Sequence, residues 1–404
     1  SNLPRAITSK LLASRVAFYC SARPPVTQLS EDELILRDSV RKFAEEQIRP
    51  LVKQMDEEHE MHQSVIDGLF EQGYMGLDIP EQYDGAGLNF FSSVIVIEEL
   101  ARVDPSVSVM VDVQNTLVNI AVQGWGSEEQ KAKYLPKLAT GTLGSFCLSE
   151  WTSGSDAFAL KARAEKKGND YVLNGTKAWI TNAKQAGLFI VLANVAPEKG
   201  YKGITAFLVE RDNPGLTVNK PEKKLGICAS STCEVQLENC IVSEDAILGE
   251  LGKGYQIAIQ TLNKGRIGIG AQMVGCAQGA FDITVPYLKQ REQFKQPLSD
   301  FQAIQHQVAR AATDIEIARL LVYNAGRGVA IGQGDELQCS MAKLVSSEAA
   351  ERVTSACVNL LGGVGFTKDL GVEKYYRDAK IGQIYEGTSN IQLQTIAKRL
   401  FKEH

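Results

Sequence analysis

Residues 171–180 read Tyr-Val-Leu-Asn-Gly-Thr-Lys-Ala-Trp-Ile and carry the strongest strand signal in the chain. Asn-Gly stands between two runs rich in β-branched and aromatic residues, a pattern that predicts a β-hairpin. Runs rich in Val, Ile, Phe and Thr surround this segment from about residue 143 onward, and they predict further strands over 187–194, 203–210, 224–227 and 232–239. We therefore expect residues 143–250 to form an antiparallel β domain.

The sequence before this domain has helical periodicity. Apolar residues recur at helical spacing from Leu36 to Leu51, with Ser30 or Asp32 as a candidate N-cap. Ser127-Glu-Glu-Gln130 has the pattern of a capping box and predicts a short helix that ends near Thr140-Gly141. Three further helical segments are predicted over 64–72, 91–103 and 107–123.

Helical periodicity returns after the β domain and continues to the end. Helices are predicted over about 255–291, 301–320, 336–361 and 388–402. Long helices joined by short loops indicate an antiparallel bundle. The predicted fold is therefore α+β, with an N-terminal helical domain (31–142), a middle β domain (143–250) and a C-terminal helical domain (251–404).

Composition places the chain among ordinary globular proteins. It has 404 residues, of which 44% are hydrophobic and 23% charged, and a formal net charge of −5. No run of about 20 apolar residues predicts a membrane span, and the charge gives no reason to expect nucleic acid. The eight cysteines match no zinc pattern and are predicted to be free thiols, and no histidine-based metal site is visible.

Residues 1–30 differ from the rest. They contain Arg5, Lys10, Arg15 and Arg23 and many hydroxyl side chains, and the first acid is Glu31. A basic, acid-free and potentially amphipathic start is typical of a mitochondrial transit peptide. A disordered tail is the alternative, and we leave the segment out of the fold prediction.

Common nucleotide and hydrolase motifs are missing. The chain has no G-x-G-x-x-G after a strand, no P-loop and no G-x-S-x-G elbow. Gly362-Gly-Val-Gly365 follows a predicted helix, so it is not a dinucleotide fingerprint. The motif evidence for a nicotinamide or nucleotide-hydrolysing enzyme is therefore absent.

Several weaker signals remain, each with a plainer interpretation. The hydroxyl-rich turn that ends Phe146–Asp156 could bind an anionic or carbonyl-rich ring, or be an ordinary polar turn. Trp179-Ile-Thr181 could line a site or belong to a core. Arg291 at a helix end could hold a phosphate or lie on the surface, and Asn263-Lys-Gly-Arg266 offers two cations or a solvated helix face.

The segment Ile384–Gln392, IYEGTSNIQ, contains one carboxylate in an otherwise nearly uncharged run. Glu386 is therefore either a capping or solvated turn residue, or a base kept in a tight, partly apolar place. Gly387 beside it lets the backbone approach a ligand closely.

Taken together, these segments resemble the acyl-CoA dehydrogenases, flavoenzymes of mitochondrial fatty-acid and branched-chain amino-acid oxidation. The resemblance covers about residues 30–404 and the order of domains. It is carried by FCLSEWTSGSD, NGTKAWIT, KLGICASSTC, REQFKQPLSDFQAIQ, LLGGVGFTKD and IYEGTSNIQ, in the family's order and spacing. Short/branched-chain members are the most similar, as in GRIGIGAQM and VEKYYRDAKIG. The implied fold has a barrel- or sandwich-like middle domain and a C-terminal four-helix bundle.

The resemblance implies a role for each matching residue. Glu386 would be the catalytic base. The FAD site would comprise Phe146, Leu148, Ser149, Thr152, Gly154, Ser155, Trp179, Ile180, Thr181, Arg291, Gln302, Asn359, Leu361, Gly362, Gly363, Thr388, Ser389 and Asn390. Of these, Arg291, Gln302 and the 361–363 loop would come from a neighbouring subunit. The acyl-CoA would contact Ser155, Tyr201, Tyr255, Asn263, Lys264, Gly265 and Arg266.

The implied reaction removes a proton from Cα and a hydride from Cβ of an acyl-CoA. A free Glu has a pKa of about 4.3, so the base must be desolvated to work near neutral pH. In the family, the backbone N–H of the base residue and a ribityl hydroxyl of FAD polarise the thioester carbonyl. A minority of members carries the base on the long helix, at the position of Gly265 here, and glycine cannot serve as a base.

Three departures from the family pattern stand out: Trp151 in the hydroxyl-rich turn before Asp156, Lys295 in place of a glycine, and Cys228 in place of an arginine. The implied partners are an acyl-CoA substrate, electron-transferring flavoprotein and three further copies of the chain in a homotetramer, in the mitochondrial matrix. Two alternatives stay open: the same site run in reverse as a branched enoyl-CoA reductase, and a non-catalytic assembly protein of the same fold.

Overall fold

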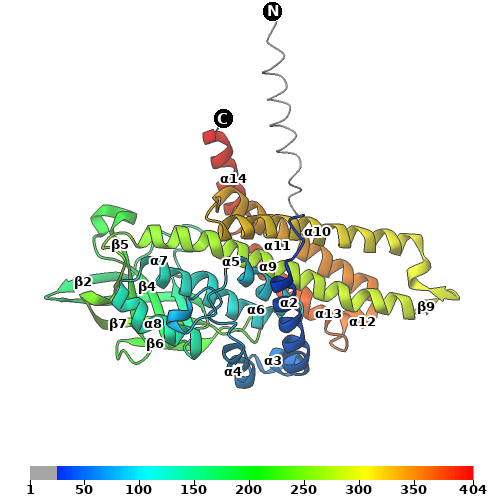
Figure 1. The fold of residues 1–404 in the computed structure, drawn as a ribbon, viewed down its shortest axis with the longest axis horizontal. Helices are drawn as coiled ribbons and strands as arrows, with labels where there is room; N and C mark the ends of the chain where they lie inside the picture. Colours follow the sequence, from blue (N-terminus) through cyan, green and yellow to red (C-terminus); the bar gives the residue numbers. More distant parts are fainter. Residues whose placement is uncertain (1–24, 404) are drawn as a thin grey trace, which may run out of the picture.

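The computed structural model describes residues 25–403 (Figure 1). Residues 1–24, which are most of the segment predicted as a transit peptide (1–30), lie outside this range. Short helices come first, a β domain follows at one end of the long axis, and long helices complete the chain. The three-part α+β architecture predicted from the sequence is confirmed.

The N-terminal part is helical. Its helices are α2 (Glu31–Phe43), α3 (Val52–Glu58), α4 (Gln63–Glu71), α5 (Phe90–Ala101), α6 (Pro105–Asp112), α7 (Ile120–Trp125) and α8 (Glu128–Thr140). Shorter turns are the π segment η1 (Ala44–Ile48) and the 3₁₀ turns η2 (Arg49–Leu51) and η3 (Glu81–Tyr83). Ser30 and Ser127 both form complete capping boxes, with Glu33 and Gln130 respectively. Both predicted caps are confirmed.

The helix predicted over 107–123 is interrupted. It begins at Pro105, because Asp104 accepts a hydrogen bond from the Ser106 N–H, and it widens into a π segment, η4 (Val113–Asn119). The Asn115 amide donates to the Tyr74 carbonyl at 2.8 Å, and the Asn119 amide donates to the Met75 carbonyl at 2.8 Å. These buried bonds tie η4 to the chain beyond α4 and fix the helix wall that faces the β domain.

The β domain contains β1 (Gly144–Cys147), β2 (Arg163–Lys167), β3 (Asp170–Thr181), β4 (Leu188–Asn194), β5 (Ile204–Glu210), β6 (Leu216–Pro221), β7 (Thr232–Ser243) and β8 (Ile247–Leu248), with η5 (Pro197–Gly203) and η6 (Glu244–Ala246) between strands. The strand order is β6-β7-β3-β2-β4-β5-β8, and β1 pairs with β4. The pairs β1–β4 and β2–β4 are parallel, so the prediction of a purely antiparallel sheet is wrong at these two pairs.

The predicted hairpin at Asn174-Gly175 is also wrong. Strand β3 runs straight through these residues, and the chain reverses instead at Gly168, whose φ is +64°. The Asn174 carboxamide accepts the Asn239 N–H at 2.7 Å, where the register between β3 and β7 shifts. A Cβ on Gly175 would lie 2.7 Å from that of Ala162, so this glycine serves close packing rather than a turn.

The strand predicted over 224–227 is a loop. The Ile227 N–H donates to the Asp378 carboxylate, and a Cβ on Gly226 would lie 2.3 Å from the Arg377 carbonyl oxygen. Contact with the last helices therefore takes this segment out of the sheet, and the strand lies earlier, at β6.

The C-terminal part is built on one long helix. Helix α9 (Gly254–Gln290) runs from the β domain to a small hairpin, β9 (Glu292–Gln293) and β10 (Gln296–Pro297), at the opposite end of the molecule (Figure 1). After η7 (Leu298–Asp300), the elements are α10 (Gln302–Ala330), α11 (Glu336–Leu361), α12 (Gly363–Phe366), α13 (Val372–Ala379), η8 (Lys380–Gln383) and α14 (Ser389–Glu403).

Buried charges connect the parts. Lys374 of α13 is buried and donates to Asp104 at 2.7 Å and to Asp378 at 2.6 Å. Asp378 in turn holds the loop at Ile227. Because removing one member of such a buried network leaves an uncompensated charge, these contacts fix the helices against the β domain.

The prediction of free thiols agrees with the structure over the described residues. The seven cysteines between residues 25 and 403 are free and buried. Within that range no cluster of His, Cys, Asp or Glu is arranged to hold a metal ion. Nor does any helix of that part have the length and hydrophobicity needed to cross a membrane.

Candidate active site

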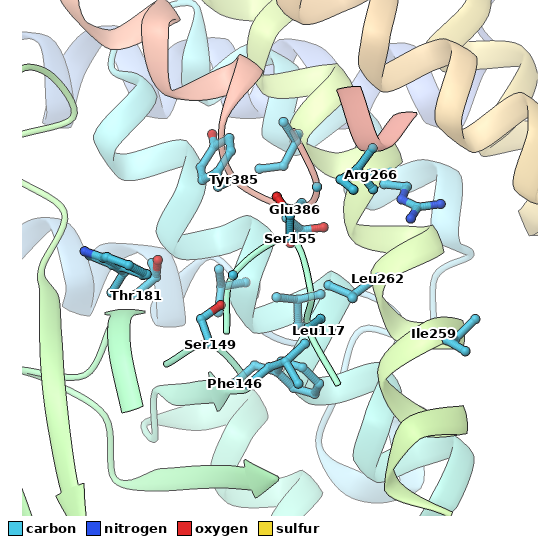
Figure 2. A pocket seen from close by; sticks show the side chains of 18 of the residues that line it. Leu117, Phe146, Ser149, Ser155, Thr181, Ile259, Leu262, Arg266, Tyr385 and Glu386 are labelled. Atoms are coloured by element: carbon cyan, nitrogen blue, oxygen red, sulfur yellow. The ribbon is translucent and has the colours of Figure 1, made fainter. Parts of the chain in front are cut away.

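A cavity of about 390 Å³ lies where the β domain meets η4, α9 and the loop before α14. The polar side chains in its lining are Ser149, Ser155, Asp156, Thr181, Arg266, Glu336 and Glu386. Figure 2 shows Glu386 on the loop above the cavity, Thr181 of β3 on one side, and Leu262 and Ile259 of α9 on the other.

The loop that carries Glu386 has an uncommon backbone. Glu386 has φ +51° and Gly387 has φ +88°. A left-handed conformation costs a non-glycine residue free energy and persists only where surrounding contacts impose it. Here the Gln392 amide donates to the carbonyls of Glu386 (3.0 Å) and Gly387 (2.9 Å), and the buried Lys343 ammonium donates to Gly387 at 2.7 Å.

One oxygen of the Glu386 carboxylate is enclosed. Its Oε2 is shut off from solvent and has no hydrogen-bond partner. Burial raises the pKa of Glu386 well above its usual value, and the nearby Asp112 carboxylate raises it further, whereas Arg266 and Lys343 lower it. A desolvated carboxylate of raised pKa is suited to accept a proton near neutral pH.

Gly265 of α9 makes room for this carboxylate. A Cβ at position 265 would lie 2.1 Å from Glu386 Oε2 and 2.7 Å from its Cδ. The structure therefore places Gly265 against the carboxylate of Glu386, where any side chain would displace it.

The turn at residues 148–156 is fixed by a buried ion pair that the sequence did not reveal. Lys177 of β3 has no exposed surface and donates to the Glu150 carboxylate at 2.8 Å and to the Leu148 carbonyl at 3.1 Å. Glu150 also accepts the backbone N–H of Lys161 (2.6 Å) and of Ala162 (3.0 Å). These contacts thus hold the turn from residue 148 to 156 against strand β3.

Trp179 and Trp151 form a pair of indoles next to the cavity. Trp179 lines it with φ +58° and remains 47% exposed. Trp151 packs edge-on to Trp179 with ring centroids 4.9 Å apart, and its Nε1–H donates to Glu234 at 2.6 Å. The departure at Trp151 therefore extends an aromatic wall.

The apolar lining of the cavity was missed by sequence reasoning. Its lining comes from η4 and the helices around it, and comprises Val109, Val113, Leu117, Ile259, Leu262 and Ile269. Val109, Val113 and Leu117 recur every four residues, a spacing typical of any buried helix face. The signal was present but did not distinguish a ligand pocket from a core. Phe158, Tyr385 and Ile391 also line the cavity and were not predicted.

Comparison with known proteins identifies the family of the chain. Three family models match in order: the acyl-CoA dehydrogenase N-terminal domain over residues 30–142, the middle domain over 145–240 and the C-terminal domain over 252–401. A probable short/branched chain specific acyl-CoA dehydrogenase of Dictyostelium discoideum is 59% identical over 94% of this chain and 92% of its own length. The chain belongs to the acyl-CoA dehydrogenase family.

Other members of the acyl-CoA dehydrogenase family are similar over the same extent. The mitochondrial short/branched chain specific acyl-CoA dehydrogenase of Bos taurus is 54% identical over 99% of this chain and 93% of its own length. The structure of butyryl-CoA dehydrogenase from Megasphaera elsdenii superposes with a TM-score of 0.91 at 37% identity, covering 93% of this chain and 99% of that one. A glutaryl-CoA dehydrogenase from Mycobacterium smegmatis, solved in complex with FADH2, has a TM-score of 0.88 at 32% identity, covering 93% of this chain and 95% of that one.

The cavity fits the flavin that acyl-CoA dehydrogenases use. Trp179, Ile180 and Thr181, at the end of β3, line the cavity. A Cβ at Gly154 would meet nothing within 4 Å, so the turn leaves open space there for a ring. The hydroxyl of Ser389, at the start of α14, is buried without a partner.

The predicted residues divide into three groups. Those that line the cavity are Phe146, Leu148, Ser149, Gly154, Ser155, Trp179, Ile180, Thr181, Arg266 and Glu386. Those on adjoining segments are Thr152, Asn263, Lys264, Gly265, Thr388, Ser389 and Asn390. The second group also includes Tyr201 and Tyr255, whose rings pack edge-on with centroids 5.0 Å apart; the Tyr255 ring contacts that of the cavity residue Phe158 in the same way, with centroids 6.4 Å apart.

The third group does not line the cavity of the same chain: Arg291, Gln302, Asn359, Leu361, Gly362 and Gly363. Arg291 follows α9 at the end of the molecule opposite the β domain (Figure 1). Lys295 lies there as well, with φ +65° in a turn that favours glycine. The Cys228 thiol instead lies 3.9 Å from Arg377 Nη1, near α13 and away from the cavity lining.

Proposed function

We propose that this protein is an FAD-dependent short/branched-chain acyl-CoA dehydrogenase in which Glu386 is the base. The observation that carries the proposal is the Glu386 carboxylate, whose Oε2 is shut off from solvent beside a cavity lined by polar and apolar side chains. High identity to short/branched-chain members over nearly the full length supports the substrate class.

The apolar side chains that line the cavity contact the acyl chain. Val113, Leu117 and Ile269 exclude water from it, which favours a short or branched hydrocarbon over a charged group. The thioester then lies beneath Glu386, where Oε2 has no competing hydrogen bond.

Glu386 removes the α-proton. Its carboxylate gains a proton as the Cα–H bond breaks, while the Cβ–H bond breaks with loss of a hydride and the Cα=Cβ double bond forms. FAD supplies the hydride acceptor when bound. The backbone N–H of Glu386 polarises the thioester carbonyl, a contribution of about 3–4 kcal/mol for a donor of this type.

The flavin is held by residues of this chain and of a second copy. Ser149, Ser155 and Thr181 supply polar groups to the ring, and Trp179 backs it. Arg291 lies too far along α9 to serve the same cavity, so we propose that it reaches the cavity of another subunit. Three exposed phenylalanines in the C-terminal helical part support a homo-oligomer: Phe294 (89% exposed), Phe366 (83%) and Phe401 (87%).

We further propose a homotetramer in the mitochondrial matrix that passes electrons to electron-transferring flavoprotein. The mitochondrial relatives and the basic, acid-free first 30 residues support this location. The half-exposed Trp179 provides the flavin site with a face open to a redox partner.

The test is a substrate series. The purified protein, loaded with FAD, is mixed anaerobically with butyryl-, 2-methylbutyryl-, isobutyryl- and hexanoyl-CoA, and bleaching of the flavin is followed. We expect the highest kcat/KM with a short or branched chain and turnover with oxidised electron-transferring flavoprotein. No bleaching by any of the four would refute the proposal, and turnover only with reduced flavoprotein and a 2-enoyl-CoA would assign the reverse reaction.

A further inference from the structure

Two buried charges without an ordinary ion-pair partner lie on either side of the Glu386 loop. Asp112, at the end of α6, has no exposed surface, and its Oδ2 has no hydrogen-bond partner. Lys343, in α11, has no exposed surface either, and its ammonium donates to the carbonyl of Gly387. Buried charges are costly, and the reaction described above uses neither of them directly.

The position of Asp112 follows from two glycines on α9. A Cβ on Gly265 would lie 2.1 Å from Glu386 Oε2, and a Cβ on Gly268 would lie 1.9 Å from Asp112 Oδ1. Residues three apart share a helix face and are separated by about 4.5 Å along the axis. The carboxylates of Glu386 and Asp112 therefore lie against neighbouring glycines on one face of α9.

Neighbouring carboxylates in a dry site do not ionise independently. Asp112 Oδ1 accepts the Thr116 hydroxyl at 2.8 Å, its one hydrogen bond. Burial raises the pKa of Asp112 to about 7. Like charges held close in a low dielectric each disfavour ionisation of the other, so a negative Asp112 makes Glu386 harder to ionise.

Lys343 has the opposite effect on the ionisation of Glu386. It approaches from α11 and donates to the carbonyl one residue beyond the base, at 2.7 Å. Burial lowers the pKa of Lys343 to about 8, and Glu386 counteracts this. A cation this close to the loop favours the ionised form of Glu386.

Other groups around the base complete its surroundings. Arg266 of α9 is held by the Asn263 carboxamide (3.0 Å) and the Ser340 hydroxyl (3.1 Å), and Glu336 and Cys339 lie near Arg266. Tyr385 donates to Gln272, and burial raises its pKa well above the usual value, so it stays neutral. The charged side chains near Glu386 that have no role assigned so far are thus one carboxylate, Asp112, and one ammonium, Lys343.

We propose that Asp112 and Lys343 are positioning residues of opposite charge that together set the pH at which Glu386 ionises. This inference rests on the proposed role of Glu386 as the base. Since Glu386 must be ionised to accept a proton, its ionisation appears as the acidic limb of kcat/KM against pH.

The test measures that limb in the FAD-loaded protein with the best acyl-CoA substrate. Asp112→Asn removes the neighbouring negative charge and should move the limb to lower pH by about one unit. Lys343→Met removes the cation and should move it to higher pH by about one unit. The double variant should lie close to the parent, because the two effects oppose each other.

Exposed residues supply matched controls. Glu129→Gln and Lys53→Met neutralise one acid and one base on the surface and should leave the limb in place. If Lys343→Met does not fold, Lys343→Gln keeps a donor for the Gly387 carbonyl without the charge, and the same upward shift is expected. Flavin content and melting temperature identify variants that are damaged generally.

The outcomes are distinct. Opposite shifts in the single variants and cancellation in the double variant support the inference. Limbs that do not move, or that move in the same direction, overturn it while leaving Glu386 as the base. A parent protein that turns over no acyl-CoA refutes the proposed function, and the inference falls with it.

Discussion

Replacing Gly265 by alanine tests the placement of the base with a single methyl group. The added Cβ would lie 2.1 Å from Glu386 Oε2 and 2.7 Å from its Cδ, whereas ordinary contact begins at about 3.4 Å. The carboxylate must therefore retreat by about 1.3 Å. Because it is the flexible end of a side chain, it can do so without unfolding the helix.

The expected effect is large on catalysis and small on stability. A displacement of about 1 Å at a reacting group can lower the rate about 100-fold, equivalent to about 2.7 kcal/mol. Alanine is meanwhile favoured over glycine inside a helix by about 0.5–1 kcal/mol. We therefore expect Gly265→Ala to melt at or slightly above the parent temperature while its kcat falls about 100-fold.

The assay combines stopped-flow flavin reduction with thermal unfolding. Gly124→Ala in α7 is the matched control, because a Cβ there meets nothing within 4 Å, and it should keep the parent kcat. If Gly265→Ala reduced its flavin as fast as the parent, the carboxylate at Gly265 would not be the group that takes the proton, and the reasoning would fail.

Three other predictions concern the turn at residues 148–156 and the contacts between subunits. Lys177→Met leaves Glu150 buried without its partner and should cost about 3–5 kcal/mol of unfolding free energy, which denaturant unfolding measures; adding Glu150→Gln should recover part of the loss. Arg291→Ala should purify with little FAD. Hybrid oligomers formed by mixing Arg291→Ala with Glu386→Gln should regain activity, because one site then combines an intact Glu386 from one subunit with an intact Arg291 from the other. If each subunit supplied both residues of its own site, the hybrids would stay inactive. Trp151→Ala removes an edge contact between indoles and should weaken FAD binding about 2- to 10-fold in a fluorescence titration, since aromatic pairs contribute about 0.5–1.5 kcal/mol; an unchanged Kd would count against the aromatic wall.

Sequence patterns predicted the helices and the main chemical group well, because the evidence for both is local. The capping boxes at Ser30 and Ser127 and the long helix α9 depend on residues within a few turns. Glu386 stood out because its surroundings in the chain are uncharged, and the structure brings it to the cavity.

What sequence missed depends on contacts between distant segments. Asn174-Gly175 has the composition of a turn, yet Ala162 packs against that glycine and the strand continues. Asp112 and Lys343 look like any charged residues in a helix, and only their burial beside the Glu386 loop gives them meaning.

The most direct test of the account is the rate of flavin reduction in Glu386→Gln. Glutamine keeps the size of the side chain but cannot accept the α-proton. Anaerobic stopped-flow mixing with 2-methylbutyryl-CoA should show normal FAD content and substrate binding but flavin bleaching slowed at least about 1,000-fold, in the range expected for loss of a general base. Bleaching at the parent rate would contradict the assignment of Glu386 as the base.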